Sequence, residues 1–333
     1  MRAAASATAI AHPNIALVKY WGKRDDAANL PAVGSLSLTL DALATRTTVR
    51  FDPGLAADEL LLDGKPDEPT RRRVTRCLDL LRERAGHAMR AQVSTQNDFP
   101  TGAGLASSAS GFAALVVAGA AALGLDLPAD DLAGVARIGS GSAPRSLHGG
   151  FAVLRNLPSG GVVCEPLLAA GAWPLRVIVA VTSSLPKDVG SRDGMRLSRG
   201  TSPYYEAWVS SHPPDLAAAE DAVRRRDFTA LATVAEASCL KMHAVMMSSR
   251  PPLLYWTAAT VAAIEAVRAL RRAGTDVFFT IDAGPQVKAV CTAAAAPAVM
   301  AALAVVPGVT RIIDSGLGDG ARRIDPAQRP AHR

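Results

Sequence analysis

One uncharged stretch, residues 99–125, restricts most strongly how this chain can fold. It opens with the Gly- and Ser-rich segment 100–111 and continues as a run in which Ala, Val, Leu and Gly predominate. A membrane-spanning helix needs about 20 strongly apolar residues, and the small residues here do not meet that requirement. We therefore expect a strand over 91–95, a Gly-rich loop, and a buried helix over 105–123.

The Gly- and Ser-rich segment has two interpretations. In the first, Gly102 and Gly104 let the backbone approach an anion closely, and the free N–H groups of the following helix favour phosphate. Hydroxyl groups of Ser107, Ser108 and Ser110 add hydrogen bonds. In the second, the segment is only a tight loop before a buried helix. It lacks the lysine of the G-x-x-x-x-G-K-[ST] loop and the third glycine of G-x-G-x-x-G, so neither standard nucleotide motif is present.

A second segment, residues 14–24, combines charge with aromatic rings. Lys19 and Lys23, four residues apart, are placed to bracket an anion. Tyr20 and Trp21 offer an aromatic wall with polar tips. The alternative is that these side chains serve packing at a strand end.

A third segment, residues 139–146, again joins small polar residues to a cation. Ser140 and Ser142 flank Gly141, and Arg145 follows. The planar fork of an arginine suits a carboxylate or a phosphate. The alternative is a turn after a helix, with Arg145 on the surface.

A fourth segment, residues 279–285, places Asp282 at the end of an apolar run and before Gly-Pro. An aspartate that is partly buried at such a turn needs a partner or has a shifted pKa, which marks a functional candidate. The alternative is an aspartate that only makes a turn bond to its own backbone.

Composition narrows the classes of partner. The chain has 333 residues, a net charge of +6 and a pI near 9.4, yet it has no long basic run, and aromatic residues are only 5 %. These features exclude a nucleic-acid surface built on stacking rings, and leave small anionic substrates. The four cysteines lie far apart, so we expect buried free thiols in a reducing cytoplasm, with no metal cluster and no disulfide framework. The beginning of the sequence lacks the apolar core of a signal peptide.

Hydrophobic patterning predicts a mixed α and β chain with two domains, residues 1–183 and 184–333, because long helices dominate beyond 183. We expect the arginines at 71–73 and 224–226 to face solvent, His243 to serve packing or to support the site without catalysing, and residues 322–333 to fray. The predicted strands are 7–18, 35–40, 47–51, 59–62, 91–95, 150–155, 175–182, 276–282, 287–291 and 310–314. The predicted helices are 70–85, 105–123, 129–137, 205–211, 216–225, 228–248, 257–273 and 293–305.

Together and in this order, the four segments resemble the GHMP kinase superfamily, and within it the diphosphomevalonate decarboxylase family. The run Asn-Ile-Ala-Leu-Val-Lys-Tyr-Trp-Gly-Lys-Arg at 14–24 is similar to the first motif of that family. The other similarities are to its phosphate loop at 98–111, its carboxylate-binding segment at 137–146 and its last motif at 281–285. Weaker similarities extend the resemblance over residues 9–320. The chain departs from the family at 32–35, which would lie in the nucleotide-side wall, and at Gly102, Pro144 and His148.

The resemblance implies an α+β GHMP kinase fold: an N-terminal domain like ribosomal protein S5 domain 2 and a ferredoxin-like C-terminal domain. It implies a cytoplasmic homodimer that binds neither nucleic acid nor membrane. It also implies ATP-dependent decarboxylation of (R)-5-diphosphomevalonate to isopentenyl diphosphate, a carboxy-lyase reaction of the mevalonate pathway that uses ATP and Mg²⁺.

The resemblance further implies roles for single residues. The catalytic group would be Asp282 as base or orienting group, Lys19 beside it, and Arg145 on the substrate carboxylate. Lys187 would lie near the nucleotide. The residues that would bind substrate are Tyr20, Trp21, Lys23, Ser140, Gly141, Ser142, Arg145, Ser191 and Arg192. The residues that would bind ATP are Pro100, Gly102, Gly104, Leu105, Ala106, Ser107, Ser108 and Ser110, with Ser107 and Ser108 also near Mg²⁺.

Two rival functions remain open from the sequence. A relative on the same scaffold could act as a phosphomevalonate decarboxylase or a mevalonate 3-kinase. A non-catalytic GHMP-like binding or regulatory protein would lack the aspartate or the phosphate loop, and this sequence has both.

Overall fold

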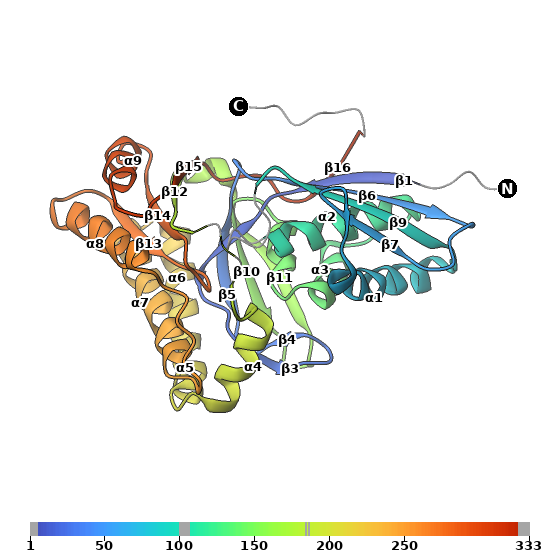
Figure 1. Ribbon diagram of the computed structural model, residues 1–333, viewed down its shortest axis with the longest axis horizontal. Helices are drawn as coiled ribbons and strands as arrows, with labels where there is room; N and C mark the ends of the chain where they lie inside the picture. Colours follow the sequence, from blue (N-terminus) through green and yellow to red (C-terminus); the bar gives the residue numbers. More distant parts are fainter. Residues whose placement is uncertain (1–5, 100–106, 184, 186, 326–333) are drawn as a thin grey trace.

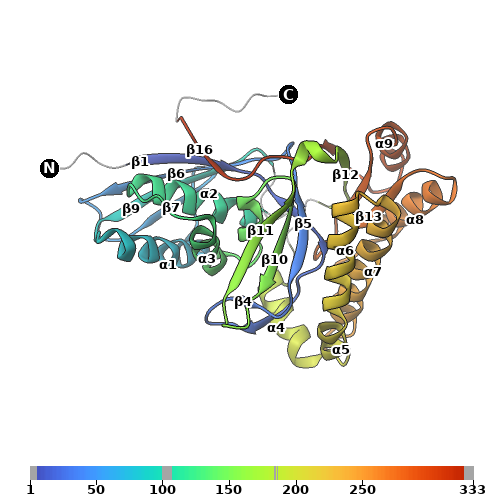
Figure 2. The same cartoon turned by 180° about the vertical axis from the view of Figure 1, so that it is seen from behind.

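The computed structural model describes residues 6–99, 107–183, 185 and 187–325. Figures 1 and 2 show an elongated molecule in which the N-terminal sheet and its helices lie at one end and the long C-terminal helices at the other. A central sheet lies between these two ends. The described parts of the four sequence segments lie near this centre.

A six-stranded sheet with the order β16-β1-β6-β9-β7-β8 forms the N-terminal end. Its strands are β1 (Ser6–Ala11), β6 (Thr45–Asp52), β7 (Glu59–Leu62), β8 (Lys65–Pro66), β9 (Arg90–Asn97) and β16 (Arg322–Ile324). Helices α1 (Glu68–Ala85), α2 (Ser107–Ala122) and α3 (Ala129–Gly139) lie on the same side of this sheet (Figure 1). Strand β16 corrects the prediction that residues 322–324 fray, because they pair antiparallel with β1.

The helix after the Gly-rich loop is buried as predicted. Ala, Val and Leu side chains of α2 line the core between β1, β6 and the other two helices. Gly119 allows α2 to pack closely against α1, because a Cβ at this position would lie 2.9 Å from the Leu81 side chain. Small residues therefore set the distance between α2 and α1.

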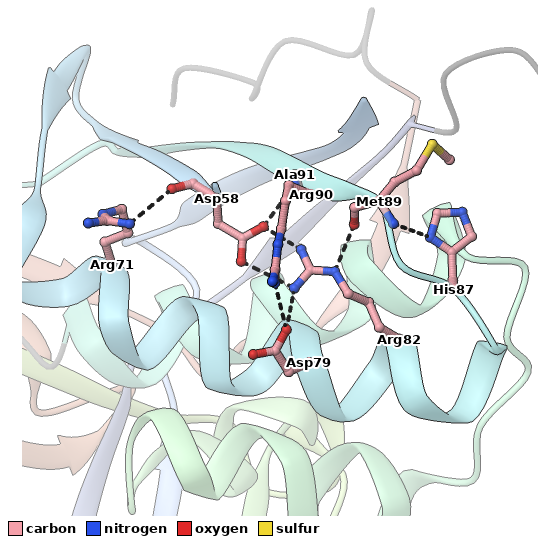
Figure 3. A network of polar contacts seen from close by, with 8 residues as sticks. All are labelled: Asp58, Arg71, Asp79, Arg82, His87, Met89, Arg90 and Ala91. Atoms are coloured by element: carbon pink, nitrogen blue, oxygen red, sulfur yellow. Dashed lines mark hydrogen bonds and ion pairs between the residues drawn. The ribbon is translucent and has the colours of Figure 1, made fainter. Parts of the chain in front are cut away.

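Helix α1 is tied to the sheet by a buried ion network (Figure 3). Arg82 donates to both carboxylate oxygens of Asp58, which also accepts from the Ala91 N–H at 2.8 Å. Asp79 accepts a further bond from Arg82 at 2.7 Å, and the Met89 carbonyl accepts another at 2.8 Å. These bonds fix α1 against β9.

The central sheet has the order β11-β10-β5-β2. Its strands are β2 (Asn14–Val18), β5 (Ser35–Thr39), β10 (Phe151–Asn156) and β11 (Val162–Leu168), and a small pair, β3 (Lys23–Asp25) and β4 (Leu30–Pro31), lies beside it. Every residue of β2 and β5 is buried. Sequence patterning missed β11, where Glu165 and Pro166 interrupt the apolar alternation.

The C-terminal sheet has the order β13-β14-β12-β15. Its strands are β12 (Leu175–Val181), β13 (Val277–Thr280), β14 (Val287–Thr292) and β15 (Arg311–Ser315). The helices beyond β12 are α4 (Ser191–Thr201), α5 (Tyr205–Ser210), α6 (His212–Arg225), α7 (Phe228–Met247), α8 (Ala258–Arg272) and α9 (Ala296–Ala304). Helix α4 was not predicted, because its few apolar side chains lie among glycine, serine and charged residues.

Strand β12 bears on the proposed domain limit. It lies before residue 184 in the chain, yet it pairs with β14 and β15. By its position in the chain β12 belongs to the first predicted domain, whereas by its pairing it belongs to the C-terminal sheet. The division at 183/184 therefore stays a prediction. Two short 3₁₀ turns, η1 (Ala143–Leu147) and η2 (Ala170–Ala172), complete the described elements.

Candidate active site

Asp282 lies where the N-terminal and C-terminal halves meet, two residues after β13 ends. Lys19, which directly follows β2, donates to Asp282 Oδ1 at 2.9 Å and to the Ala16 carbonyl at 2.6 Å. Lys288 of β14 places its Nζ 3.2 Å from Asp282 Oδ2. The two lysine side chains are 1 % and 0 % exposed, whereas that of Asp282 is 27 % exposed. The carboxylate thus has a cation at each oxygen and one open side.

The charge state of Asp282 follows from this geometry. Burial raises the pKa of the carboxyl group, but the positive charges of Lys19 and Lys288 outweigh burial and bring the pKa well below its ordinary value. Burial also lowers the pKa of Lys288, which the charge of Asp282 partly opposes. Asp282 is therefore an anion at neutral pH.

Sequence reasoning found the Lys19–Asp282 pair but missed Lys288. The two paired residues are 263 positions apart. The signal for Lys288 was available, since it is the one charged residue in the apolar run 287–291.

Helix α7 supports the backbone around Asp282. The Ile281 N–H donates to Cys239 Sγ at 3.2 Å, and the Lys19 N–H donates to Ser238 Oγ at 2.9 Å. Burial lowers the pKa of His243 to about 3, so this ring is neutral, and it packs against Trp256 with the ring centroids 4.8 Å apart. These contacts agree with the predicted packing role of His243.

Arg145 is held in place from the central sheet. Its Nε donates to Asn14 Oδ1 at 3.2 Å and its Nη1 donates to Ser35 Oγ. Asn14 in turn donates to Ser146 Oγ at 2.8 Å. Arg145 is 2 % exposed, so it is not the surface residue of the alternative interpretation. Within the described chain it forms no salt bridge, and burial lowers its pKa.

Three of the predicted segments meet at a row of hydroxyl groups. Ser140 Oγ lies 3.3 Å from Ser108 Oγ and 3.2 Å from Ser142 Oγ. A Cβ on Gly141 would lie 2.7 Å from Tyr20 Oη, so a side chain there would displace the Tyr20 ring. Burial raises the pKa of Tyr20, which keeps its hydroxyl protonated.

Cations gather beside this row. Burial and the charge of Arg192 lower the pKa of Lys23, and the same two causes lower the pKa of Arg73. Arg73 donates to the Gly139 carbonyl at 3.2 Å, and its guanidinium lies 5.1 Å from the centre of the Phe112 ring. The prediction that residues 71–73 all face solvent is therefore wrong at Arg73, whereas Arg224, Arg225 and Arg226 are exposed as predicted.

The remaining predicted substrate residues lie on or against α4. Ser191 is the first residue of this helix, and Arg192 follows it. Trp21 is 2 % exposed and donates to Ser198 Oγ of the same helix at 3.0 Å. Its ring makes an edge contact with Tyr255, with centroids 6.5 Å apart. Trp21 thus positions α4 more than it offers a free surface.

The start of α2 opens onto a cavity of about 190 Å³. Its lining includes Leu60, Leu62, Arg73, Asn97, Ser107, Ser108 and Phe112. Ser108 is exposed, whereas Ser110 is buried, and its Oγ lies 2.6 Å from Thr45 Oγ1. The predicted loop residues Pro100, Gly102, Gly104, Leu105 and Ala106 lie outside the described residues.

The residues at 32–35, where the chain departs from the family, lie beside α6. Ala32, Val33 and Gly34 line a separate groove of about 660 Å³ against α6, which shares no residue with the cavity at α2. A Cβ on Gly34 would lie 2.6 Å from Leu216 Cδ2. The close approach of α6 leaves no room for a side chain at this position.

Comparison with family models decides the relationship. Residues 11–159 match the diphosphomevalonate decarboxylase-like N-terminal domain, and residues 177–319 match the mevalonate 5-diphosphate decarboxylase C-terminal domain. The chain belongs to the diphosphomevalonate decarboxylase family. This membership agrees with the resemblance in its four motifs, and the fold is the GHMP kinase fold.

Individual members of the family are similar over most of the chain. The diphosphomevalonate decarboxylase of Aspergillus fumigatus is 39 % identical over 302 residues, which cover 84 % of this chain and 75 % of the relative. The human enzyme is 35 % identical over 304 residues, with coverage of 84 % and 75 %.

Solved structures of the family are similar as well. A crystal structure of mevalonate diphosphate decarboxylase from Staphylococcus aureus has a TM-score of 0.91 at 37 % identity, covering 97 % of this chain and 98 % of that one. A structure described as MDDEF in complex with MVAPP, AMPPCP and magnesium has a TM-score of 0.89 at 38 % identity, with coverage of 97 % and 100 %.

Other structural features bear on the predicted partners. None of the helices in the described ranges is long and apolar enough to cross a bilayer. Across the same ranges, no three His, Cys, Asp or Glu side chains lie close enough together to hold a metal ion. All four cysteines are free and buried, as predicted.

Proposed function

We propose that this protein catalyses the ATP-dependent decarboxylation of (R)-5-diphosphomevalonate to isopentenyl diphosphate. The observation that carries the proposal is the ionised Asp282 held between two buried lysines, within a chain of this family. The relative described as MDDEF binds MVAPP together with AMPPCP and magnesium. The cations and hydroxyl groups gathered at this site suit the same kinds of ligand.

The difficult step is phosphoryl transfer to a tertiary hydroxyl, which is a poor nucleophile. Asp282 presents its open side to that hydroxyl and orients it or accepts its proton as the new bond to the γ-phosphorus of ATP forms and the bond from that phosphorus to ADP breaks. Lys19 keeps the carboxylate ionised and opposes the negative charge that develops nearby. Loss of the 3-phosphate and of CO₂ then gives the alkene.

Arg145 is proposed to bind the carboxylate that leaves as CO₂. Its bonds to Asn14 and Ser35 hold the guanidinium in one orientation, so the breaking C–C bond is held as well. The 5-diphosphate is assigned to the hydroxyl row and the cations beside it. This set comprises Tyr20, Lys23, Ser140, Gly141, Ser142, Ser191 and Arg192, with Arg73 added by its position at Gly139.

The nucleotide is assigned to the cavity at the start of α2. Exposed Ser108 and the free N–H groups of the helix suit phosphate oxygens, and Leu60, Leu62 and Phe112 suit an apolar ring system. Magnesium is held mainly by phosphates and water in such sites, which fits the hydroxyls of Ser107 and Ser108. Lys187 has a pKa lowered by burial to about 8, so it carries its proton at neutral pH and suits a nucleotide phosphate.

The test supplies the purified protein with Mg-ATP and, separately, mevalonate, 5-phosphomevalonate and 5-diphosphomevalonate. We expect ATP-dependent release of CO₂ from the diphosphate alone, measured as ¹⁴CO₂ from carboxyl-labelled substrate. Turnover of only the monophosphate, or phosphorylation without CO₂ release, would replace this function with one of its two rivals. If the protein bound 5-diphosphomevalonate in a way that ADP alters, but turned over none of the substrates, it would be a non-catalytic relative.

Three further features are proposed on the same basis: division into domains at 183/184, a homodimer, and a cytoplasmic location. Light scattering after size-exclusion chromatography tests the dimer, with one 34.5 kDa chain as the alternative. Limited proteolysis near residue 183 tests the division.

A further inference from the structure

Lys288 occupies a position that packing alone would give to an apolar side chain. In the C-terminal sheet it lies opposite Thr280 on one side and Val179 on the other. Alternate side chains of a strand point to opposite faces. Val290, which shares a face with Lys288, lies in the apolar core that contains β2, and both residues are fully buried.

A buried ammonium group carries a large desolvation cost unless a counter-charge lies beside it. Asp282 Oδ2 supplies that counter-charge at 3.2 Å. Asp282, however, already has a cation partner in Lys19. The second lysine therefore gives the cluster an excess positive charge, which does not serve neutralisation of the carboxylate alone.

We propose that Lys288 is a positioning residue of the reaction, which holds Asp282 through Oδ2 in one orientation. This inference rests on the function proposed above. Lys19 holds Oδ1 and is itself tied to the Ala16 carbonyl. With only that contact, the carboxylate could still rotate about its Cβ–Cγ bond. The second contact fixes its plane, so the open side faces the substrate hydroxyl.

Several other groups act on Asp282 through charge or contact. Arg145 approaches from η1 and Lys187 from the segment after β12, and their charges interact with the carboxylate. Cys239 and His243 face it from α7, where burial raises the pKa of the thiol and lowers that of the ring. Both are therefore neutral near pH 7. Removal of Lys288 leaves three cations, so Asp282 stays ionised at pH 7 but becomes a stronger base.

The experiment uses the full chain with Lys288→Met and Lys288→Gln. The first removes charge and hydrogen bond, and the second keeps a donor without charge. We expect kcat to fall about 10²-fold in K288M, as for a misplaced catalytic group, with KM for both substrates nearly unchanged. K288Q should recover part of this loss.

A second readout does not depend on turnover. The side-chain carboxyl carbon of Asp282 is observed by ¹³C NMR and assigned through its absence in D282N. Its titration midpoint should rise by about 1–3 pH units in both Lys288 variants, because one adjacent cation is gone. Val290→Ala is the matched control: it disturbs the same face of β14 without a change in charge, so the midpoint should stay in place.

An unshifted midpoint and a wild-type kcat in K288M would overturn the inference. An equal shift in V290A would assign the effect to packing and overturn it as well. If K288M does not fold, the titration of K288Q decides alone. If the wild type releases no CO₂ from any mevalonate derivative, the proposed function fails, and the titration still tests the link between Lys288 and Asp282.

Discussion

Two aspartates, each with cations beside it, differ in how much of the side chain remains open to solvent. Asp58 is 3 % exposed and accepts from the Arg82 guanidinium and from the Ala91 N–H, so its oxygens are occupied on all sides. Asp282 has one lysine on each oxygen and keeps a side chain that is 27 % exposed. The first cluster joins a helix to a sheet, whereas the second leaves a charged group available to a ligand.

The difference also lies in the type of cation. An arginine offers a planar fork that matches both oxygens of one carboxylate. A lysine offers a single charged point, so two lysines are needed to define the carboxylate plane. An aspartate held by lysines from two separate strands is positioned by the meeting of the two halves, and it depends on their relative placement.

The largest expected effect tests the open cluster. Asp282→Asn removes the group that orients the substrate hydroxyl, and we expect the rate of ATP-dependent CO₂ release to fall about 10²–10⁴-fold. Asp314→Asn is a matched control, because Asp314 lies in the same sheet and pairs with Arg176 away from the site. If D282N were as active as D314N, Asp282 would have no part in catalysis, and the two aspartate clusters would not differ in function.

The next effect tests the closed cluster. Asp58→Asn removes the buried carboxylate from the Arg82 guanidinium and leaves it only the half-exposed carboxylate of Asp79, and we expect the free energy of unfolding to fall by about 3 kcal/mol. Urea unfolding followed by circular dichroism measures it. The kcat of the folded fraction should equal that of the wild type. A large loss of kcat with unchanged stability would show that this network serves catalysis.

The pH dependence of the free energy of unfolding tests the region around Asp282 separately from the Asp58 network at α1. Burial lowers the pKa of His243 to about 3, from an ordinary 6.5. Between these values the unfolded chain binds a proton that the folded chain does not, so stability falls as pH drops below about 6.5.

Replacement His243→Gln should therefore reduce the slope of unfolding free energy against pH by about 1.4 kcal/mol per pH unit between pH 5 and 6. Asp282 does not contribute in this window, because its lowered pKa keeps its stabilisation until the pH falls below the ordinary 3.8. Urea unfolding at pH 5, 6 and 8 provides the slope, with pH 8 as the reference, because at that pH the wild-type His243 ring is neutral in both the folded and the unfolded chain. Identical slopes would contradict the assignment.

The smallest expected effect concerns an exposed ion pair, which serves as the reference for the two aspartate clusters. Arg84 and Asp131 form an ion pair at 3.5 Å with side chains that are 38 % and 48 % exposed. Arg84→Ala should change the free energy of unfolding by less than about 0.5 kcal/mol, since exposed pairs gain little in water. If Arg84→Ala lowered the free energy of unfolding as much as Asp58→Asn, burial would not explain why the Asp58 network is the more stabilising of the two.

Local patterning predicted most elements of the fold. Helices with one apolar side, such as α1 and α8, were found to within two residues at each end. Among the elements that were missed are the short strands β3, β4 and β8, the strand β11 and the helix α4, which have few apolar residues or an interrupted apolar pattern. Strand β16 was predicted to fray because its residues are polar, yet β1 offered it an unpaired edge.

The sequence by itself determined the family, through four motifs whose residue types and order are specific, and it identified Asp282, Lys19 and Arg145 as the groups suited to the chemistry. Only the tertiary structure decided which of these groups touch, that Lys288 completes the cluster, and that Arg73 turns inward to Gly139. The physical reason is that residue type and spacing follow from local sequence. The charge and pKa of a buried group follow from contacts between segments as far apart as Lys19 and Asp282.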